Sequence, residues 1–135
     1  MSLPALDTSA LLALLWQEPG WEIVADALDA TGCQMSAVNV AEFVGKVQER
    51  QPDARKIETL LGELPISIIA YNREQAIDTG ILRATTRHLG LSLGDRACLA
   101  LALQEKATVL TADRPWLNLA VELGLDIRCI RPDTC

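Results

Sequence analysis

Short apolar runs alternate along the chain with amphipathic segments of helical length. The apolar runs fall at residues 4–6, 33–35, 66–70, 108–111 and 126–130. Between them, apolar residues recur three or four positions apart, which is typical of helices that bury one face. Strands that alternate with helices form a mainly parallel sheet that is covered on both faces. We therefore expect an α/β fold with about five short strands in one central sheet.

The segment 91–116 contains a helix without a clear polar face. Every residue from Ala97 to Leu103 is apolar, so this helix is predicted to be buried. Ser92 and Asp95 have the spacing of a helix start, and Asp113 follows the short strand after the helix. Two carboxylates therefore flank one buried unit, and α/β proteins bind ligands at the carboxyl ends of their strands.

The helix predicted over 74–89 has two distinct faces. Its apolar stripe, formed by Ile77, Ile81 and Ala84, is expected to face inward. Arg83 and Arg87 lie one turn apart on another face. The strand at 66–70, just before this helix, is a candidate for an edge of the sheet.

Length and composition fit a single domain over residues 1–135. The chain is 50% hydrophobic, which is enough for a sizeable core. No apolar run approaches the roughly 18 residues of a membrane span. The N-terminus lacks the pattern of a signal peptide, so we expect a cytoplasmic protein.

The charge balance argues against a broad basic surface for nucleic acid, because the formal net charge is −6. It does not exclude phosphate chemistry, since acids that bind divalent cations count as negative until the metal arrives. The four cysteines, Cys33, Cys98, Cys129 and Cys135, form no C-x-x-C pair, and only His88 could join them in a metal site. We therefore expect reduced, structural cysteines.

Four acids occupy positions that suit a shared site. Asp7 and Asp113 follow strands, Asp95 lies at the start of the buried helix, and Glu42 lies on the helix after the second strand. If the strands are parallel, these positions converge on one rim of the sheet. Four carboxylates in one cleft repel each other unless they are protonated or neutralised by a cation. Oxygen ligands suit Mg²⁺ or Mn²⁺, and such ions can activate water against a phosphodiester.

Each acid also has a simpler structural explanation. Asp7 could be an N-cap alone, Asp95 the second member of a capping box with Ser92, and Asp113 a turn residue. Glu42 is harder to explain, since neither a cap nor a helix dipole accounts for an acid among apolar neighbours. The joint placement of the four acids favours a site.

At these residues the sequence resembles the PIN domain, a family of Mg²⁺-dependent nucleases with a three-layer α/β/α fold. The motifs that carry the resemblance are Asp7-Thr8-Ser9, Ser36…Asn39…Glu42, Gly94-Asp95…Ala100 and Thr111-Ala112-Asp113. The resemblance implies that Asp7, Glu42, Asp95 and Asp113 are catalytic and hold Mg²⁺, for which Mn²⁺ can substitute. It also implies a second shell of polar side chains around them, formed by Thr8, Ser9, Ser36, Asn39 and Thr111.

The compact length looks most like the VapC-like toxin ribonucleases of type II toxin–antitoxin pairs. This resemblance implies an RNA substrate, a cognate antitoxin protein and a homodimer, and the stripe that begins at Ile77 could serve the dimer surface or the core. Arg83, Arg87 and Arg96 are candidates for contacts with RNA phosphates, although solvated helix charges explain them equally well.

Two other functions need residues that this chain lacks, and two further functions remain as alternatives. A haloacid-dehalogenase-type phosphatase needs a second Asp where this chain has Ser9, and a receiver domain needs an acidic pair and a late lysine that are not present. A catalytically silent binding module would keep the fold without the chemistry, and the presence of all four acids counts against it. A housekeeping RNA-processing nuclease would share the chemistry and lack the antitoxin.

Overall fold

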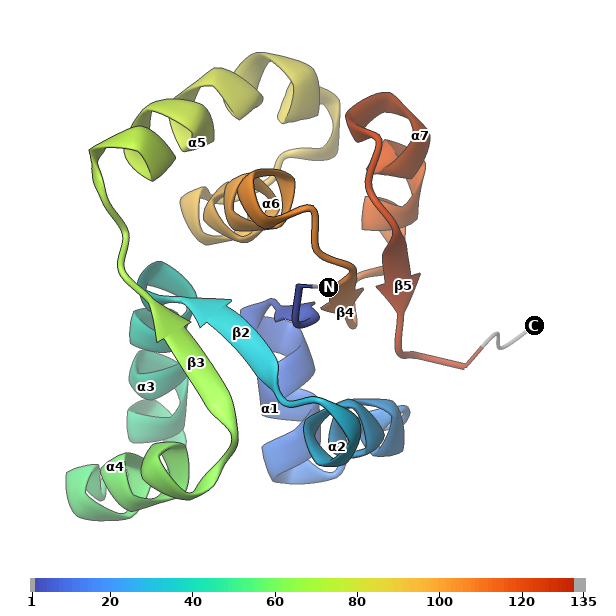
Figure 1. Ribbon diagram of the computed structural model, residues 1–135. Helices are drawn as coiled ribbons and strands as arrows, with labels where there is room; N and C mark the ends of the chain where they lie inside the picture. Colours follow the sequence, from blue (N-terminus) through green and yellow to red (C-terminus); the bar gives the residue numbers. More distant parts are fainter. Residues whose placement is uncertain (1, 133–135) are drawn as a thin grey trace.

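The computed structural model describes residues 2–132 as a parallel sheet enclosed by helices (Figure 1). Its strands are β1 (Ala5–Leu6), β2 (Cys33–Ser36), β3 (Ile66–Ile69), β4 (Val109–Thr111) and β5 (Ile127–Cys129). Its α-helices are α1 (Thr8–Trp16), α2 (Trp21–Ala30), α3 (Ala37–Arg50), α4 (Ala54–Glu63), α5 (Arg73–Thr86), α6 (Leu93–Glu105) and α7 (Ala120–Leu123). Two 3-10 helices, η1 (Arg87–Leu89) and η2 (Arg114–Leu119), follow α5 and β4.

The five strands lie in the order β3-β2-β1-β4-β5, and every neighbouring pair is parallel. The chain first builds the sheet from β1 outward to β3, and then returns to the other side of β1 to add β4 and β5. The strand order therefore reverses between β1 and β4, where Leu6 pairs with Leu110. Parallel sheets bind ligands at such a reversal, beyond the carboxyl ends of the strands.

Alternate side chains on the central strands pack into two separate cores. Leu6 and Leu110 join the core beneath α1, α2, α3 and α4. Ala5 and Val109 point to the opposite face and join the core formed by α5, α6 and η2. This period of two places helices on both faces of the sheet, so the predicted three-layer α/β/α fold is confirmed.

Helix α6 is as buried as its apolar sequence predicts. From Ala97 to Ala102 no residue is more than 1% exposed, while Leu103 is 36% exposed near the end of the helix. The helix packs on β1 and β2 and against α3 and α5. It therefore fixes the position of its own first turn, which carries Asp95.

The inward orientation expected for the apolar stripe of α5 is wrong, so the stripe does not belong to the core and the surface alternative remains. Ile77 is 47% exposed, Ile81 is 67% exposed and Ala84 is also exposed. The face turned toward α6 carries Thr79 and Thr86, whose hydroxyls donate to carbonyls of the preceding turn at 2.6 and 2.7 Å. Because these bonds satisfy the hydroxyls internally, the two threonines can be buried beside Leu82, which supplies the apolar contact of this face.

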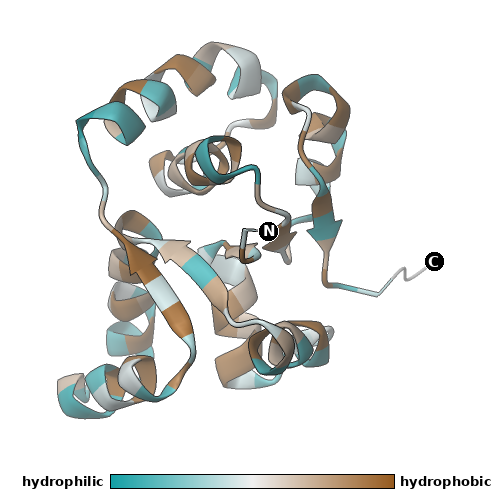
Figure 2. Cartoon of the chain, viewed as in Figure 1, coloured by the Kyte–Doolittle hydropathy of each residue, from teal (hydrophilic) through white to brown (hydrophobic). Residues whose placement is uncertain are grey.

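Other local expectations hold or need adjustment. Strand β3 lies at an edge, as suggested, and is among the more hydrophobic segments in Figure 2. The segment after β4 forms the 3-10 helix η2, followed by the single turn of α7. Cys33, Cys98 and Cys129 are free thiols, and Cys135 lies outside the described residues. None of the described helices is long and apolar enough to cross a membrane.

Candidate active site

An open cleft of about 470 Å³ lies beyond the carboxyl ends of β1 and β4, and we call it the acidic cleft. The structure brings all four predicted acids to its lining. The complete lining is formed by Asp7, Thr8, Ser9, Glu42, Lys46, Ser92, Asp95, Ala112, Asp113 and Arg131. The cleft therefore lies where the reversal of strand order predicts a ligand site.

Asp7 is the most buried acid of the cleft, with 3% of its surface exposed. Its Oδ1 accepts from Ala10 N at 2.8 Å, so Asp7 does cap α1. Ser9 Oγ donates to both carboxylate oxygens at 2.7 and 2.9 Å, and Thr111 Oγ1 donates to Oδ2 at 2.7 Å. Burial raises the pKa of Asp7 to about 6 despite these bonds, and the charge of Asp95 adds to the increase.

Glu42 is held by side chains from two helices. Thr8 Oγ1 donates to Glu42 Oε1 at 2.8 Å, and Asn39 Nδ2 lies 3.3 Å from the same oxygen. Asn39 is 1% exposed, and its Nδ2 also donates to Gly94 O at 2.9 Å. These bonds join α1, α3 and α6 immediately behind the cleft.

Gly94 gives the Glu42 carboxylate the space that it occupies. A Cβ atom built on Gly94 would lie 2.1 Å from Glu42 Oε1 and 2.4 Å from Oε2. Any side chain at this position would therefore displace the carboxylate. The Gly94-Asp95 pair consequently has two roles at the start of α6: the glycine accommodates one acid and the next residue supplies another.

Asp95 combines a local structural role with its position in the cleft, and Asp113 lies in the cleft without a capping hydrogen bond of its own. Asp95 Oδ2 accepts from Ser92 N at 3.0 Å, and Ser92 Oγ accepts from Asp95 N at 3.1 Å, which completes the expected capping box. Asp113 is exposed just beyond β4. Partial desolvation, followed by the charge of Asp95, raises the pKa of Asp113. Capping and membership of the cleft are therefore compatible.

The negative field of the acids extends to a buried thiol. Burial raises the pKa of Cys98 well above its ordinary value, and the charges of Asp7, Asp95 and Glu42 raise it further. Cys98 is on the first turns of α6, so the three carboxylates converge around the start of this helix. The thiol remains protonated and acts as a small apolar group.

Two basic residues that the sequence analysis missed also line the cleft. Lys46 lies one turn after Glu42 on α3, and this spacing is the signal that could have revealed it. Arg131 follows β5 and pairs with Glu18 at 3.4 Å. No sequence pattern near Arg131 predicts that its side chain lines the cleft.

The remaining predicted residues lie beneath Asp7, at the start of α3 or in a neighbouring cavity. Thr111 lies beneath Asp7, as described, and Ser36 caps α3 by accepting from Val38 N at 3.2 Å. Arg83, Arg87 and Arg96 line a separate cavity that shares Ser92 with the acidic cleft. The structure thus brings the three arginines together beside the cleft.

The donor chemistry of the cleft suits a hard divalent cation, because carboxylate and hydroxyl oxygens surround it and no cysteine or histidine lines it. Asn39 Oδ1, next to Glu42, is buried and lacks a hydrogen-bond partner among the described residues. Within residues 2–132, no group of three or more Asp, Glu, His or Cys side chains has an arrangement that could hold a metal ion. A shared ion would therefore require the acidic side chains to come closer together than they lie here.

The fold and the cleft define a three-layer α/β/α domain with an acidic site at its strand-order reversal. A family model described as the PIN domain matches residues 5–122. The chain therefore belongs to the PIN domain family, as its motifs predict.

Solved structures share this fold at low sequence identity. A toxin–antitoxin complex from Klebsiella pneumoniae has a TM-score of 0.70 at 18% identity, covering 96% of this chain and 99% of that chain. VapBC2 from Rickettsia felis, bound to a DNA fragment from its promoter, has a TM-score of 0.71 at 16% identity, covering 93% and 96%. FitAcB from Neisseria gonorrhoeae has a TM-score of 0.67 at 22% identity, also covering 93% and 96%. No curated protein matches the chain.

The pKa of Asp7 predicts how the stability of the metal-free protein depends on pH. Because this pKa rises from 3.8 to about 6 on folding, the folded state binds more protons than the unfolded state between these values. The free energy of unfolding should therefore fall as pH rises through this window, by about 3 kcal/mol. Asp7→Asn should remove most of this dependence in urea unfolding with a chelator present. Asp53→Asn, which changes the capping acid of α4, is the control; an unchanged slope in Asp7→Asn would contradict the assignment.

Gly94→Ala should destabilise the protein by about 1–2 kcal/mol, because the methyl group displaces Glu42 from Thr8 and Asn39. Gly45→Ala, on the exposed face of α3 with no atom within 4 Å, should stabilise it by up to about 1 kcal/mol. A double-mutant cycle measured by urea unfolding isolates the contact. In a Glu42→Ala background, Gly94→Ala should no longer lower the free energy of unfolding. An equal cost in both backgrounds would show that the overlap with Glu42 is not its cause.

Proposed function

We propose that the chain is a metal-dependent endoribonuclease and the toxin of a toxin–antitoxin pair. PIN domains are a family of nucleases, and this chain belongs to them. The observation that carries the proposal is the lining of one cleft by four carboxylates, each from a different segment of the chain. Their mutual repulsion favours a divalent cation in the cleft.

Asp7, Glu42, Asp95 and Asp113 would hold Mg²⁺, or Mn²⁺ in its place. When bound, the cation would neutralise the acids, activate a water molecule and stabilise the leaving oxygen. Water would add across the P–O3′ bond of RNA, leaving a 5′-phosphate on one product and a 3′-hydroxyl on the other.

The polar residues around the acids would orient them for this reaction. Ser9 and Thr111 hold Asp7 through both of its oxygens. Thr8 and Asn39 donate to a single oxygen of Glu42, so they leave the other available. Such partners restrict the rotation of ligand side chains and increase their affinity for metal.

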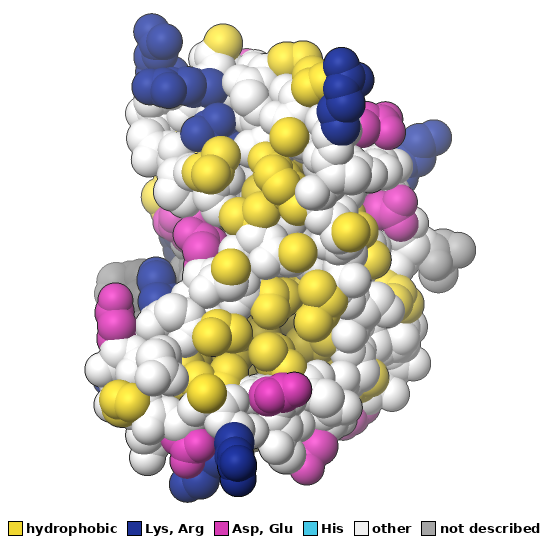
Figure 3. Space-filling view, turned by 90° about the vertical axis from the view of Figure 1, so that its left-hand side faces the viewer, with side chains coloured by type: hydrophobic (Ala, Val, Ile, Leu, Met, Phe, Trp, Pro, Cys, Tyr) yellow, Lys and Arg dark blue, Asp and Glu magenta, His cyan; other side chains and the backbone are white. Residues whose placement is uncertain are grey.

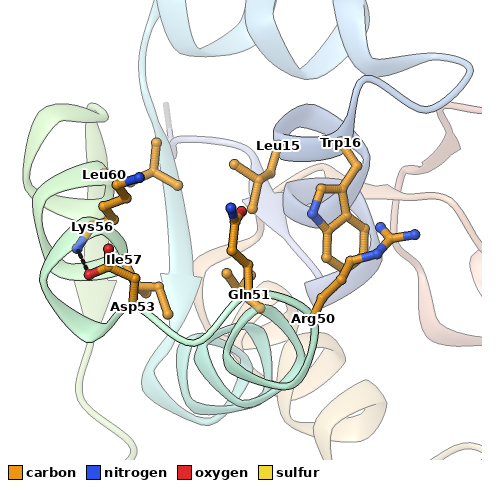
Figure 4. A pocket seen from close by; sticks show the side chains of 9 residues that line it. Leu15, Trp16, Arg50, Gln51, Asp53, Lys56, Ile57 and Leu60 are labelled. Atoms are coloured by element: carbon orange, nitrogen blue, oxygen red, sulfur yellow. Dashed lines mark hydrogen bonds between the residues drawn. The ribbon is translucent and has the colours of Figure 1, made fainter.

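An antitoxin partner is supported by the folds that this chain resembles and by an apolar groove away from the acidic cleft. The toxin–antitoxin complex from Klebsiella pneumoniae and the VapBC2 complex share the fold. In this chain, two adjoining cavities of about 310 and 230 Å³ share Leu15 and Leu60, between α1 and α4. Figure 4 shows the larger one, with Trp16 beneath the guanidinium of Arg50, 4.1 Å from the ring centroid.

The acidic cleft lies at the start of α1, and the groove begins on the middle turns of this helix and continues to its end. Leu11 is the groove residue nearest to the cleft along the helix, and about 6 Å of helix axis separates it from Asp7. One antitoxin segment could therefore place apolar side chains in the groove and a basic side chain in the cleft. Charge complementarity would speed this encounter and weaken with salt.

We also propose a homodimer, because one face of the protein exposes apolar side chains. Ile68 on the edge strand β3 is 50% exposed, and Ile77 and Ile81 on α5 are exposed as well. Figure 3 shows hydrophobic side chains gathered across this face. Monomeric proteins rarely leave such a patch uncovered.

Substitutions of two acids test the catalytic assignment. Glu42→Gln and Asp95→Asn should each abolish cleavage of single-stranded RNA, and Asp95→Asn should reduce Mn²⁺ affinity at least about tenfold, because an amide is a poorer ligand for a hard cation. Asp95→Asn should cost at most about 1 kcal/mol of stability, since the amide oxygen can still cap α6. Isothermal titration with Mn²⁺, RNA cleavage and thermal melts provide the three readouts. Equal Mn²⁺ affinities for the wild type and Asp95→Asn would show that Asp95 caps α6 and does not bind the metal.

The toxin assignment predicts a small inhibitor encoded next to the gene of this chain. Co-expressed with that product, the chain should purify as a complex and lose RNA cleavage. Leu60→Glu should retain cleavage and escape inhibition, because it charges the apolar groove without changing the acidic cleft. Glu58→Gln, an exposed change on the same helix, should remain inhibited. Cleavage that no adjacent gene product inhibits would favour a housekeeping RNA-processing nuclease.

A further inference from the structure

A cavity of about 360 Å³ lies beside the acidic cleft and is lined by three arginines. Arg83 comes from α5, Arg87 from η1 and Arg96 from α6. The other five residues of the lining are uncharged. We call this cavity the arginine pocket.

The pocket concentrates positive charge in an acidic protein. Three of the 12 Lys and Arg residues line it, although the formal net charge of the chain is −6. Among the described residues, none of the three forms an ion pair with an acid. Guanidinium groups that share a cavity repel each other, and a bound anion offsets this repulsion because it attracts each of them.

Arg96 presents an unsatisfied donor in this region. Its Nη1 donates to Thr79 O at 3.0 Å, which anchors the side chain to α5. Its Nε is buried and has no hydrogen-bond partner in the part of the chain that the structure describes. A buried N–H group without an acceptor is costly, so the side chain would gain from a small shift that brings this group to an oxygen of an anion in the pocket.

Arg83 and Arg87 can close over such an anion from the solvent side. Both are exposed and lie one turn apart. Guanidinium groups bind phosphate oxygens through paired N–H donors, so phosphate is the anion that this chemistry favours.

The pocket adjoins the acidic cleft through a shared residue, because Ser92 lines both. An RNA strand that is cleaved in the acidic cleft would therefore pass next to the arginine pocket. We propose that the arginine pocket binds a backbone phosphate of the RNA substrate adjacent to the phosphate that is cleaved. This inference rests on the proposed ribonuclease function, and it gives the acidic protein a local cationic contact for RNA.

The test measures RNA binding without cleavage. Fluorescence anisotropy with a labelled single-stranded RNA of mixed sequence, in a chelator, compares the wild type with Arg83→Gln/Arg87→Gln. We expect binding at least about tenfold weaker for this variant. The slope of log affinity against log salt should become shallower by about 0.7 for each arginine removed. Arg83→Lys/Arg87→Lys should bind with intermediate affinity, because it keeps the charge and loses the paired donors.

Arg55→Gln/Arg73→Gln is the matched control, since it removes the same charge from exposed positions outside the pocket. Its binding should stay within about twofold of the wild type. An equal loss in the two Gln variants would overturn the proposal, because it would show a general effect of charge. Wild-type protein that does not bind RNA at low salt would overturn it as well.

A parallel assay with Mn²⁺ separates this proposal from the ribonuclease function. Wild-type protein that binds RNA through the pocket but does not cleave it would contradict the ribonuclease function alone. If the wild type cleaves RNA and Arg83→Gln/Arg87→Gln binds and cleaves RNA equally well, only the proposed phosphate binding in the arginine pocket would be overturned. Thermal melts of every variant exclude unfolding as a cause.

Discussion

The burial of the Asp7 carboxylate is the constraint on which the site depends. It lies where the strand order reverses, beneath a cleft that three other acids line. Donors from α1 and from β4 surround it, yet burial still raises its pKa to about 6. The hydrogen bonds therefore offset only part of the cost of burying the charge, and a cation in the cleft would supply the missing compensation.

A second constraint is the close approach of α3 and α6 behind the cleft. Asn39 bridges Glu42 and the backbone of Gly94, and the absence of a side chain on Gly94 lets the Glu42 carboxylate lie against α6. Because α6 is buried along most of its length, this arrangement is rigidly supported. Around it the charges are divided: acids occupy the cleft, arginines occupy the adjoining pocket, and apolar side chains line the far end of α1.

Much of this architecture could be predicted because it depends on local periodicity and capping. The alternation of short apolar strands and amphipathic helices predicts the layers, and Ser92 with Asp95 predicts the start of α6. Glu42 was identified by an anomaly, an acid among apolar neighbours without a cap or dipole to explain it. Parallel strands then required the acids to meet at one rim, and all four line the same cleft.

The sequence alone thus determined the order of the layers and the identity of the acids, since both follow from contacts between residues close in the chain. Tertiary packing decided the rest. The exposed face of α5 was mispredicted because Thr79 and Thr86 satisfy their hydroxyls within the helix, and apolar periodicity cannot detect this. The arrival of Arg131 at the cleft and the fit of Glu42 against Gly94 depend on contacts between distant segments. Such contacts exist only after folding, so no local pattern encodes them.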